Sequence, residues 1–160
     1  MKRTVLSLAT ASAFVLPAVA LAHSHAGIVI NDSIAGAKLG MAPAQVRAAT
    51  GKPAQVLHTS KSIMEYNYGD AGQLEVDFDK VHGKMVVTQV TLEPGFRNLA
   101  TSKGVRLGST KNAVMRAYPA AKFNNGIGQI WIDQLGEHNT GFLLSRANHV
   151  VQISVAWNYG

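Results

Sequence analysis

The sequence predicts an α+β fold in which short helical segments are each followed by a run of antiparallel strands. The first observation is a stretch that occurs twice, LGMAPAQV from Leu39 and LGSTKNAV from Leu107. The second is that each copy leads into segments where apolar and polar residues alternate, which is the period of a half-buried strand. The third is that these segments follow one another directly, as in an antiparallel meander, instead of alternating with helices.

The first 22 residues, MKRTVLSLATASAFVLPAVALA, have the three parts of a secretory signal peptide. Lys2 and Arg3 precede an apolar run that is too short to span a membrane comfortably, and small residues end it. We expect cleavage after Ala22, with Ala20 as a second possible site. No later apolar run approaches the roughly 20 residues of a membrane helix. The mature chain is therefore predicted to be secreted or periplasmic, with no membrane span.

Charge and cysteine content exclude several functional classes. The formal net charge of +6 falls to +4 once Lys2 and Arg3 leave with the signal. The remaining basic residues are scattered singly, whereas a nucleic-acid binder concentrates them in a patch. The chain has no cysteine, which excludes disulfides, thiol catalysis and cysteine metal sites. Stability must come from packing, and each half alone would have a thin core.

The repeat divides the mature chain into residues 23–95 and residues 96–160, two copies that we expect to form one compact unit. Shared residue types occupy equivalent positions around each LG. They are Gly36, Leu39, Gly40 and Val46 in the first copy and Gly104, Leu107, Gly108 and Val114 in the second.

Each LG is followed by a predicted helix of about two turns. Each helix has only part of the usual N-terminal capping sequence. The first copy has Pro43 at the first helical position and Gln45 as a capping-box acceptor, but Ala42 at the cap. The second has Thr110 at the cap, but Ala113 in place of the acceptor. Helices this short are unstable alone, so we expect both to pack on one face of the sheet.

The alternating segments predict a three-stranded meander in each copy. The segments are 62–68, 73–79 and 85–92 in the first copy and 129–135, 140–146 and 149–157 in the second. Turns are predicted at 69–72 and 82–84, where Gly and Asp or His gather. The pieces before each LG, around 32–37 and 98–103, are predicted to add a helical turn.

The repeated pattern G-x-[KR]-LG-[MS]-x-x-x-x-V resembles the beta-lactamase inhibitory protein fold, and it is similar to the single-copy version in small outer-membrane assembly lipoproteins. The matching residues are Gly36, Lys38 to Met41 and Val46, then Gly104, Arg106 to Ser109 and Val114. The resemblance implies helical units on one side of a sheet whose other side is free to hold a protein. The chain lacks the disulfides of the inhibitors and the lipidated cysteine of the lipoproteins. The matching residues are packing residues, so inhibition of a beta-lactamase does not follow.

No catalytic constellation emerges from the sequence, so we do not expect an enzyme, and no cofactor is implied. Asp77 and Asp79 lie near His82, a combination that could hold a cation, but their spacing is that of a solvated strand face. Glu137 and His138 lie in a predicted turn with no third partner. The chain contains no nucleophile-elbow motif and no glycine-rich phosphate loop followed by a helix.

The predicted amino terminus carries one possible metal site. Cleavage after Ala22 would place His23 first and His25 third, and cleavage after Ala20 would place His23 third. A free amine, two deprotonated amides and an imidazole at position three can form a square-planar site for Cu(II) or Ni(II). Such tails also arise by chance as plain chain termini.

The face of the sheet opposite the helices is the predicted partner-binding surface. In the first copy it would show Glu65, Asn67, Glu75, Asp77 and Asp79, and in the second Ile130, Ile132, Leu143 and Gln152. An acidic half beside an apolar half is a plausible interaction surface. The alternative register of 129–135 buries Ile130 and Ile132 and turns Trp131 outward, because a one-residue slip exchanges the faces.

Three functional classes follow from the sequence. The first is an exported, non-enzymatic module, of which an inhibitor is one form, that binds another extracytoplasmic protein through the open sheet face. The second is a structural or assembly factor of the cell envelope. The third is a small secreted metal carrier using His23 and His25, or an enzyme whose residues only the fold brings together.

Overall fold

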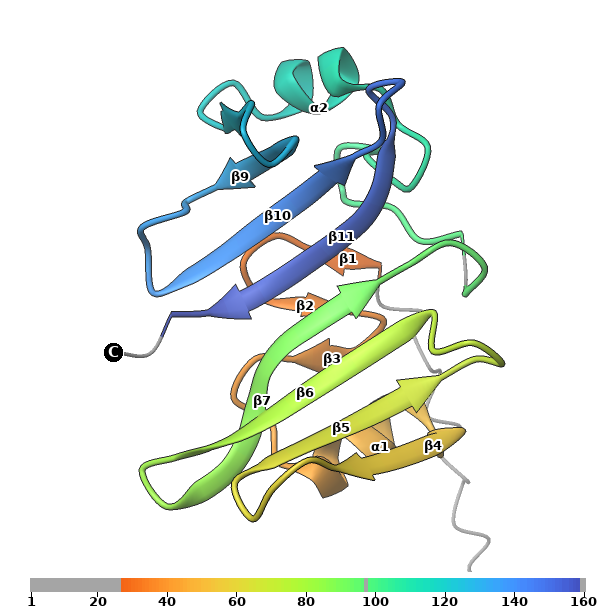
Figure 1. Cartoon of the computed structure of the whole chain (residues 1–160), viewed down its shortest axis with the longest axis vertical. Coiled ribbons are helices and arrows are strands. Elements are labelled where there is room, and N and C mark those ends of the chain that lie inside the picture. Colours follow the sequence, from red (N-terminus) through yellow and green to blue (C-terminus); the bar gives the residue numbers. More distant parts are fainter. Residues whose placement is uncertain (1–26, 97, 159–160) are drawn as a thin grey trace, which may run out of the picture.

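The computed structural model describes residues 27–96 and 98–158. They form an α+β fold with one eight-stranded antiparallel sheet, one three-stranded sheet and two short helices (Figure 1). The helices are α1 (Pro43–Thr50) and α2 (Lys111–Ala117). The small sheet consists of β1 (Ile28–Val29), β2 (Ser33–Ile34) and β3 (Ala37–Lys38). The α+β class predicted from the sequence is thereby confirmed.

The large sheet has the order β4-β5-β6-β7-β11-β10-β9-β8. Its first four strands in the chain are β4 (Gln55–His58), β5 (Ile63–Tyr68), β6 (Leu74–Val81) and β7 (Lys84–Leu92). The other four are β8 (Lys122–Asn124), β9 (Gln129–Ile132), β10 (His138–Leu144) and β11 (Val150–Trp157). Each helix therefore precedes four strands and not the predicted three. The sequence missed β4 and β8 because both are short, and no residue of β4 is buried.

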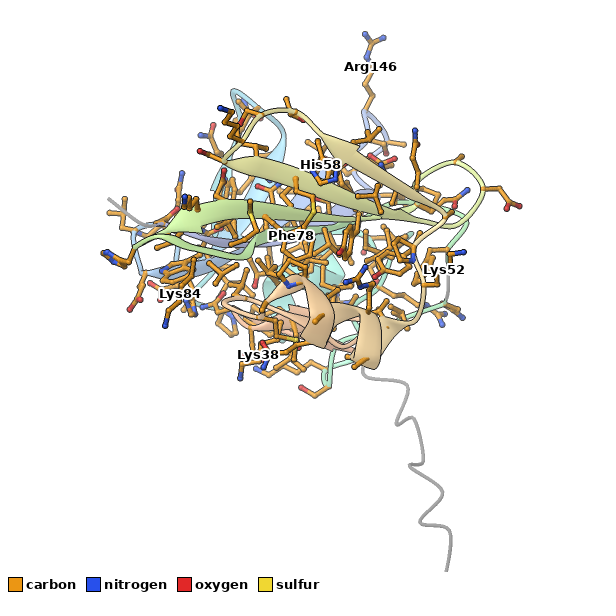
Figure 2. The ribbon with its side chains drawn as sticks, turned by 90° about the horizontal axis from the view of Figure 1, so that it is seen from below. Lys38, Lys52, His58, Phe78, Lys84 and Arg146 are labelled. Atoms are coloured by element: carbon orange, nitrogen blue, oxygen red, sulfur yellow. The ribbon has the colours of Figure 1, made fainter. Side chains whose placement is uncertain are left out.

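The helices and the small sheet lie on one side of the large sheet and share its core (Figure 2). Val46 of α1 and Val114 of α2 are fully buried, in one cluster with Phe78 of the sheet. Alternation along β5 and β6 places Met64, Tyr66, Tyr68, Leu74, Val76 and Phe78 on this inner face. The opposite, open face of the sheet faces the viewer in Figure 1.

The helix starts are capped as the sequence predicted. The backbone N–H of Ala42 donates to Gln45 Oε1 at 2.8 Å, and Ala42 has no side-chain acceptor of its own. In α2 the Thr110 hydroxyl accepts from the Ala113 N–H at 3.2 Å. Each helix thus has one half of a capping box, and both depend on packing for their remaining stability.

The predicted helical turns before each LG are wrong. Residues 33–38 form the hairpin of β2 and β3, since Ala35 and Gly36 have φ of 54° and 89°, as a tight two-residue turn requires. Residues 100–106 make an isolated bridge between Ala100 and Arg106. In each of these two segments the chain reverses direction and pairs with itself, so neither segment is a helical turn.

Each LG lies in a turn that joins its segment to the large sheet. Gly40 and Gly108 both have φ of 82°, a region that favours glycine. The Gly40 N–H donates to the Val87 carbonyl at 2.9 Å, and the Gly108 N–H donates to the Val150 carbonyl at 2.8 Å. Val87 and Val150 lie in the first halves of β7 and β11, before the stretches, 89–92 and 153–156, where those two strands pair. The LG turns therefore bond to the strand ends that flank the β7/β11 junction.

Candidate functional site: the open face of the large sheet

Strand register fixes which side chains share the open face. One row crosses all eight strands through successive paired residues. From β4 to β8 it reads Gln55, Asn67, Glu75, Thr91, Ser154, Gly141, Trp131 and Lys122. The neighbouring row reads Leu57, Glu65, Asp77, Gln89, Ala156 and Asn139. Residues from both halves of the chain thus form one continuous surface.

The predicted acidic residues of the first half meet on this face. Carboxylate oxygens of Glu65, Glu75 and Asp77 lie within 4.8 Å of one another, and all three side chains are half-buried. Asn67 donates a side-chain hydrogen bond to Glu65. We call Glu65, Glu75 and Asp77 the acidic cluster. These three residues and Asn67 alternate with the buried residues of β5 and β6, so their side chains lie on the open face.

Burial and mutual repulsion perturb the cluster's ionisation. Burial, followed by the charges of Glu75 and Glu65, raises the pKa of Asp77 to about 7. Burial and the charge of Glu65 also raise the pKa of Glu75. A hydrogen bond between the two side chains raises the pKa of Asp77 and lowers that of Glu75. In the described part of the chain, no basic group contributes to either pKa.

Asp79 does not join the cluster. It lies beyond a bulge between Asp77 and Phe78, and its carboxylate accepts a hydrogen bond from the buried Thr88 hydroxyl at 3.1 Å. His82 occupies the β6–β7 turn with a φ of 48° and is exposed. The structure therefore does not bring Asp77, Asp79 and His82 together as a cation site. The residues that lie close to Asp77 are Glu65 and Glu75.

In the second half, the predicted register of residues 129–135 is wrong for two residues. Ile130 pairs with Phe142 and is fully buried in the core, and Ile132 pairs with Thr140 and packs against the same core. The sequence could not decide this register because apolar side chains occupy both faces of this strand. Leu143 and Gln152 do lie on the open face, where they pair with each other.

Trp131 takes the outward position that the alternative register gives it. It lies opposite Gly141, and a Cβ at position 141 would come within 2.9 Å of the indole ring and 2.6 Å of Gln129 Nε2. A glycine is therefore required beneath this half-buried tryptophan. Trp131 Nε1 and Asn139 Oδ1 are both buried without a hydrogen-bond partner in the part of the chain that the structure describes. These are costly groups to leave unpaired.

A hollow adjoins the acidic cluster at the β4 edge of the sheet. It has a volume of about 600 Å³ and its lining is predominantly polar. Its walls include Gln55 of β4, Asn67 of β5, Asp70 in the β5–β6 turn, Glu75 of β6 and Glu93 after β7. Glu93 also accepts a hydrogen bond from Gln152 at 3.3 Å, which links the hollow to the second half of the chain.

The repeated structural residues lie away from this face. Val46 and Val114 are core residues, Leu39 is buried, and Leu107 packs against the core. Gly36 and Gly104, like the two LG glycines, have positive φ. His23 and His25 lie outside the described residues, so the Cu(II) or Ni(II) site stays a prediction. No helix among the described residues is long and apolar enough to cross a membrane.

Comparison with known proteins supports the fold. No family model matches the chain, and no curated protein is similar enough to count as a relative. YjgB of Bacillus subtilis, a DUF4309 family protein of known structure, aligns over 85% of this chain and 90% of its own, with 12% identity and a TM-score of 0.50. The two chains share a fold. At this identity, the likeness extends to the fold alone.

Two further solved structures match more loosely. One is an extracellular protein containing an SCP domain from Bacillus anthracis, at 12% identity and a TM-score of 0.45. The other is a cysteine-rich secretory protein, SAV1118, from Staphylococcus aureus, at 9% identity and a TM-score of 0.47. Each alignment covers 75% of this chain but only 44% of the other protein. The chain thus spans less than half the length of either.

Proposed function

We propose that this chain is an exported, non-enzymatic module that binds another extracytoplasmic protein through the open face of the sheet. The observation that carries the proposal is the acidic cluster, which holds three carboxyl groups together with no basic side chain of residues 27–96 or 98–158 contributing to the pKa of Glu75 or Asp77. Export rests on the signal peptide predicted from the sequence. The described helices and small sheet lie against the opposite face (Figure 2), so the open face is the uncovered face of the large sheet.

Electrostatics favour a partner with lysine or arginine at its contact surface. The folded chain keeps Asp77 protonated below about pH 7 because ionisation would add a third charge to a half-buried cluster. A partner's cation placed against the cluster would favour the ionised form. By linkage, the affinity for such a partner should rise between about pH 6 and 8. Trp131 supplies an aromatic contact on the same face, a residue type enriched in the hot spots of interfaces.

We also infer that the two halves arose as copies of one unit, related to the beta-lactamase inhibitory protein fold. Three features support this inference. Each helix has half a capping box, both LG glycines have the same φ, and the sheet order runs outward from β7 and β11 to the two edges. In such a duplication the packing residues persist while the surface diverges. The difference between the acidic first half and the tryptophan-bearing second half fits that expectation.

The test is capture of partners from the native exported fraction by the immobilised mature chain. The informative variant combines Glu65→Gln, Glu75→Gln and Asp77→Asn. The control removes charge elsewhere, with Asp32→Asn in the β1–β2 turn and Glu137→Gln beside β10. We expect one protein to be retained by the wild type and the control and lost by the cluster variant. Equal retention by all three would refute binding through the acidic half of the face.

The alternative, an envelope assembly factor, gives a different result in the same experiment. Its captured proteins would be envelope components, and the chain itself would sediment with the envelope fraction instead of remaining soluble. A single soluble exported partner would instead favour the inhibitor-like interpretation.

A further inference from the structure

The two edges of the large sheet differ in how open they are to another strand. At one edge, β8 has only three residues, begins with Lys122, and carries the Lys111 ammonium over the Phe123 ring at 3.2 Å. Lysine and short length are devices that discourage strand addition at an edge. At the other edge, all four residues of β4 are exposed, and none of them is proline, lysine or acidic. In the described part of the chain, β4 pairs only with β5.

The outward backbone groups of β4 follow from its register. The Thr59 N–H donates to the Ile63 carbonyl at 3.2 Å, and His58 and Leu57 pair next with Met64 and Glu65. Hydrogen-bonded and non-hydrogen-bonded pairs alternate along an antiparallel ladder. The N–H and C=O groups of Val56 and His58 therefore point away from β5, toward solvent. They offer four hydrogen-bonding groups to an added strand on the edge seen from below in Figure 2, where His58 is labelled.

Side chains on both sides of this edge would contact an added strand. Val56 and Leu57 are 41% and 38% exposed, which is unusual for apolar residues in a strand. On the open face, Leu57 pairs with Glu65 and Gln55 pairs with Asn67. Because adjacent strands are about 4.8 Å apart, Glu65 lies two strand spacings from the added backbone. A lysine or arginine side chain can span that distance.

The hollow described above opens at the same edge. Gln55 on β4 forms one wall, and the carboxyl groups of Asp70, Glu75 and Glu93 form others. These acceptors suit a guanidinium or ammonium group, which has only donors. The acid-lined hollow thus reaches the open edge at Gln55, next to the exposed apolar pair Val56 and Leu57.

We propose that β4 is a strand-addition site for an extended segment of a partner protein whose basic side chains alternate along one face, with those side chains directed to the acidic cluster and its hollow. This proposal rests on the proposed function, because it specifies the backbone conformation and the charge of the partner that the open face binds. Backbone hydrogen bonds would supply affinity and the basic side chains specificity, the usual division in strand addition.

A second copy of this chain fits the edge less well. If two β4 strands paired antiparallel, each would place Gln55 and Leu57 against the other on the open face. Neither strand would supply a cation to the partner's acidic cluster. They would also bring two acidic clusters onto one continuous surface, where like charges repel. Charge complementarity therefore selects a basic partner segment over self-association.

The experiment measures binding of a labelled peptide to the mature chain, residues 23–160, by fluorescence anisotropy. The probe is acetyl-Thr-Val-Arg-Val-Arg-Val-Thr-amide, which places both arginines on one face. A second probe has the same sequence with N-methyl groups on alternate residues, which blocks strand pairing and keeps the charge. The main variant is Val56→Pro, which removes an outward N–H that β5 does not use. Val56→Lys replaces it if the proline variant fails to fold, and Asn124→Lys at the β8 edge is the matched control.

We expect Val56→Pro, Val56→Lys and the N-methyl probe each to weaken binding at least tenfold, and Asn124→Lys to change it less than twofold. Glu75→Gln should weaken the arginine peptide but not an alanine version of it. Unchanged binding in both Val56 variants, with loss in Glu75→Gln, would overturn strand addition while leaving the proposed acidic face intact. The reverse pattern would overturn the acidic face alone. A dimer of the unliganded chain that Val56→Pro dissociates would overturn the choice of partner.

Discussion

Replacing Asp77 with asparagine should stabilise the protein in a pH-dependent way. Asparagine has nearly the shape of the protonated aspartic acid but cannot ionise. The pKa of Asp77 rises from 3.8 to about 7 on folding, chiefly through burial. At about 1.4 kcal/mol per tenfold change in affinity, the full rise corresponds to about 4 kcal/mol. Because the side chain is only half-buried, solvent screening reduces this to about 2 kcal/mol.

The sign follows from proton binding. Since the pKa is higher in the folded chain, the folded state holds the proton more tightly between about pH 4 and 7. The contribution of Asp77 to the free energy of unfolding therefore falls as the pH rises through this window and is constant above it. Asp77→Asn removes that loss. We expect the variant to exceed the wild type by about 2 kcal/mol at pH 8 and by less than about 0.5 kcal/mol at pH 4.

Urea unfolding of both proteins at pH 4 and pH 8 measures the difference directly. Asp70→Asn, an exposed change in the nearby 69–72 turn, controls for removal of one negative charge. A stabilisation equal at both pH values would mean that Asp77 is not the group that titrates. A loss of stability at pH 8 would mean that the carboxylate has a favourable partner, and the reasoning about an uncompensated cluster would fail.

Three other substitutions test particular contacts by unfolding measurements. Tyr68→Phe should cost about 1 kcal/mol, since the buried hydroxyl donates to the carbonyl of Gly51 at 3.3 Å; the tyrosine absorbance titration should also lose a group whose pKa burial raises to about 12. Gly141→Ala should cost about 1–3 kcal/mol and shift the tryptophan fluorescence, because the added Cβ displaces the Trp131 ring. An unchanged spectrum would refute that contact. Ile130→Ala should cost about 2–5 kcal/mol as a core truncation; a cost below about 0.5 kcal/mol would restore the outward register.

The sequence predicted the first half of the candidate site well, for a physical reason. Along 73–79 every second residue is charged or amide-bearing, so only one register buries the apolar residues. Along 129–135 the apolar side chains Ile130, Trp131 and Ile132 are consecutive, and alternation gives no preference. The deciding contact is Gly141, whose missing side chain accommodates the indole from the neighbouring strand. That contact joins residues far apart in the chain, and no local pattern reports it.

The features that the sequence missed are those that depend on the edges and on backbone reversal. The residues of β4 are exposed on both faces, so the strand lacks the alternation that marks β5 and β6. The β2–β3 turn depends on Ala35 adopting a left-handed conformation, which is uncommon for alanine. The coincidence of the β4 edge with the acidic hollow likewise required the fold. The turns at 69–72 and 82–84 could be predicted, because glycine gathers there with Asp or His between two alternating segments.

The staggered pairing of β7 with β11 explains the placement of the two LG turns. The strands pair over only four residues each, so the first half of each strand extends past its partner. The turn at Gly40 bonds to Val87 on one overhang, and Met41 accepts the Val87 N–H in return at 2.9 Å. The turn at Gly108 does the same for Val150, whose N–H donates to Ser109 at 2.9 Å. A staggered antiparallel junction has two overhangs, and in this chain each overhang exchanges two backbone hydrogen bonds with one of the two LG turns.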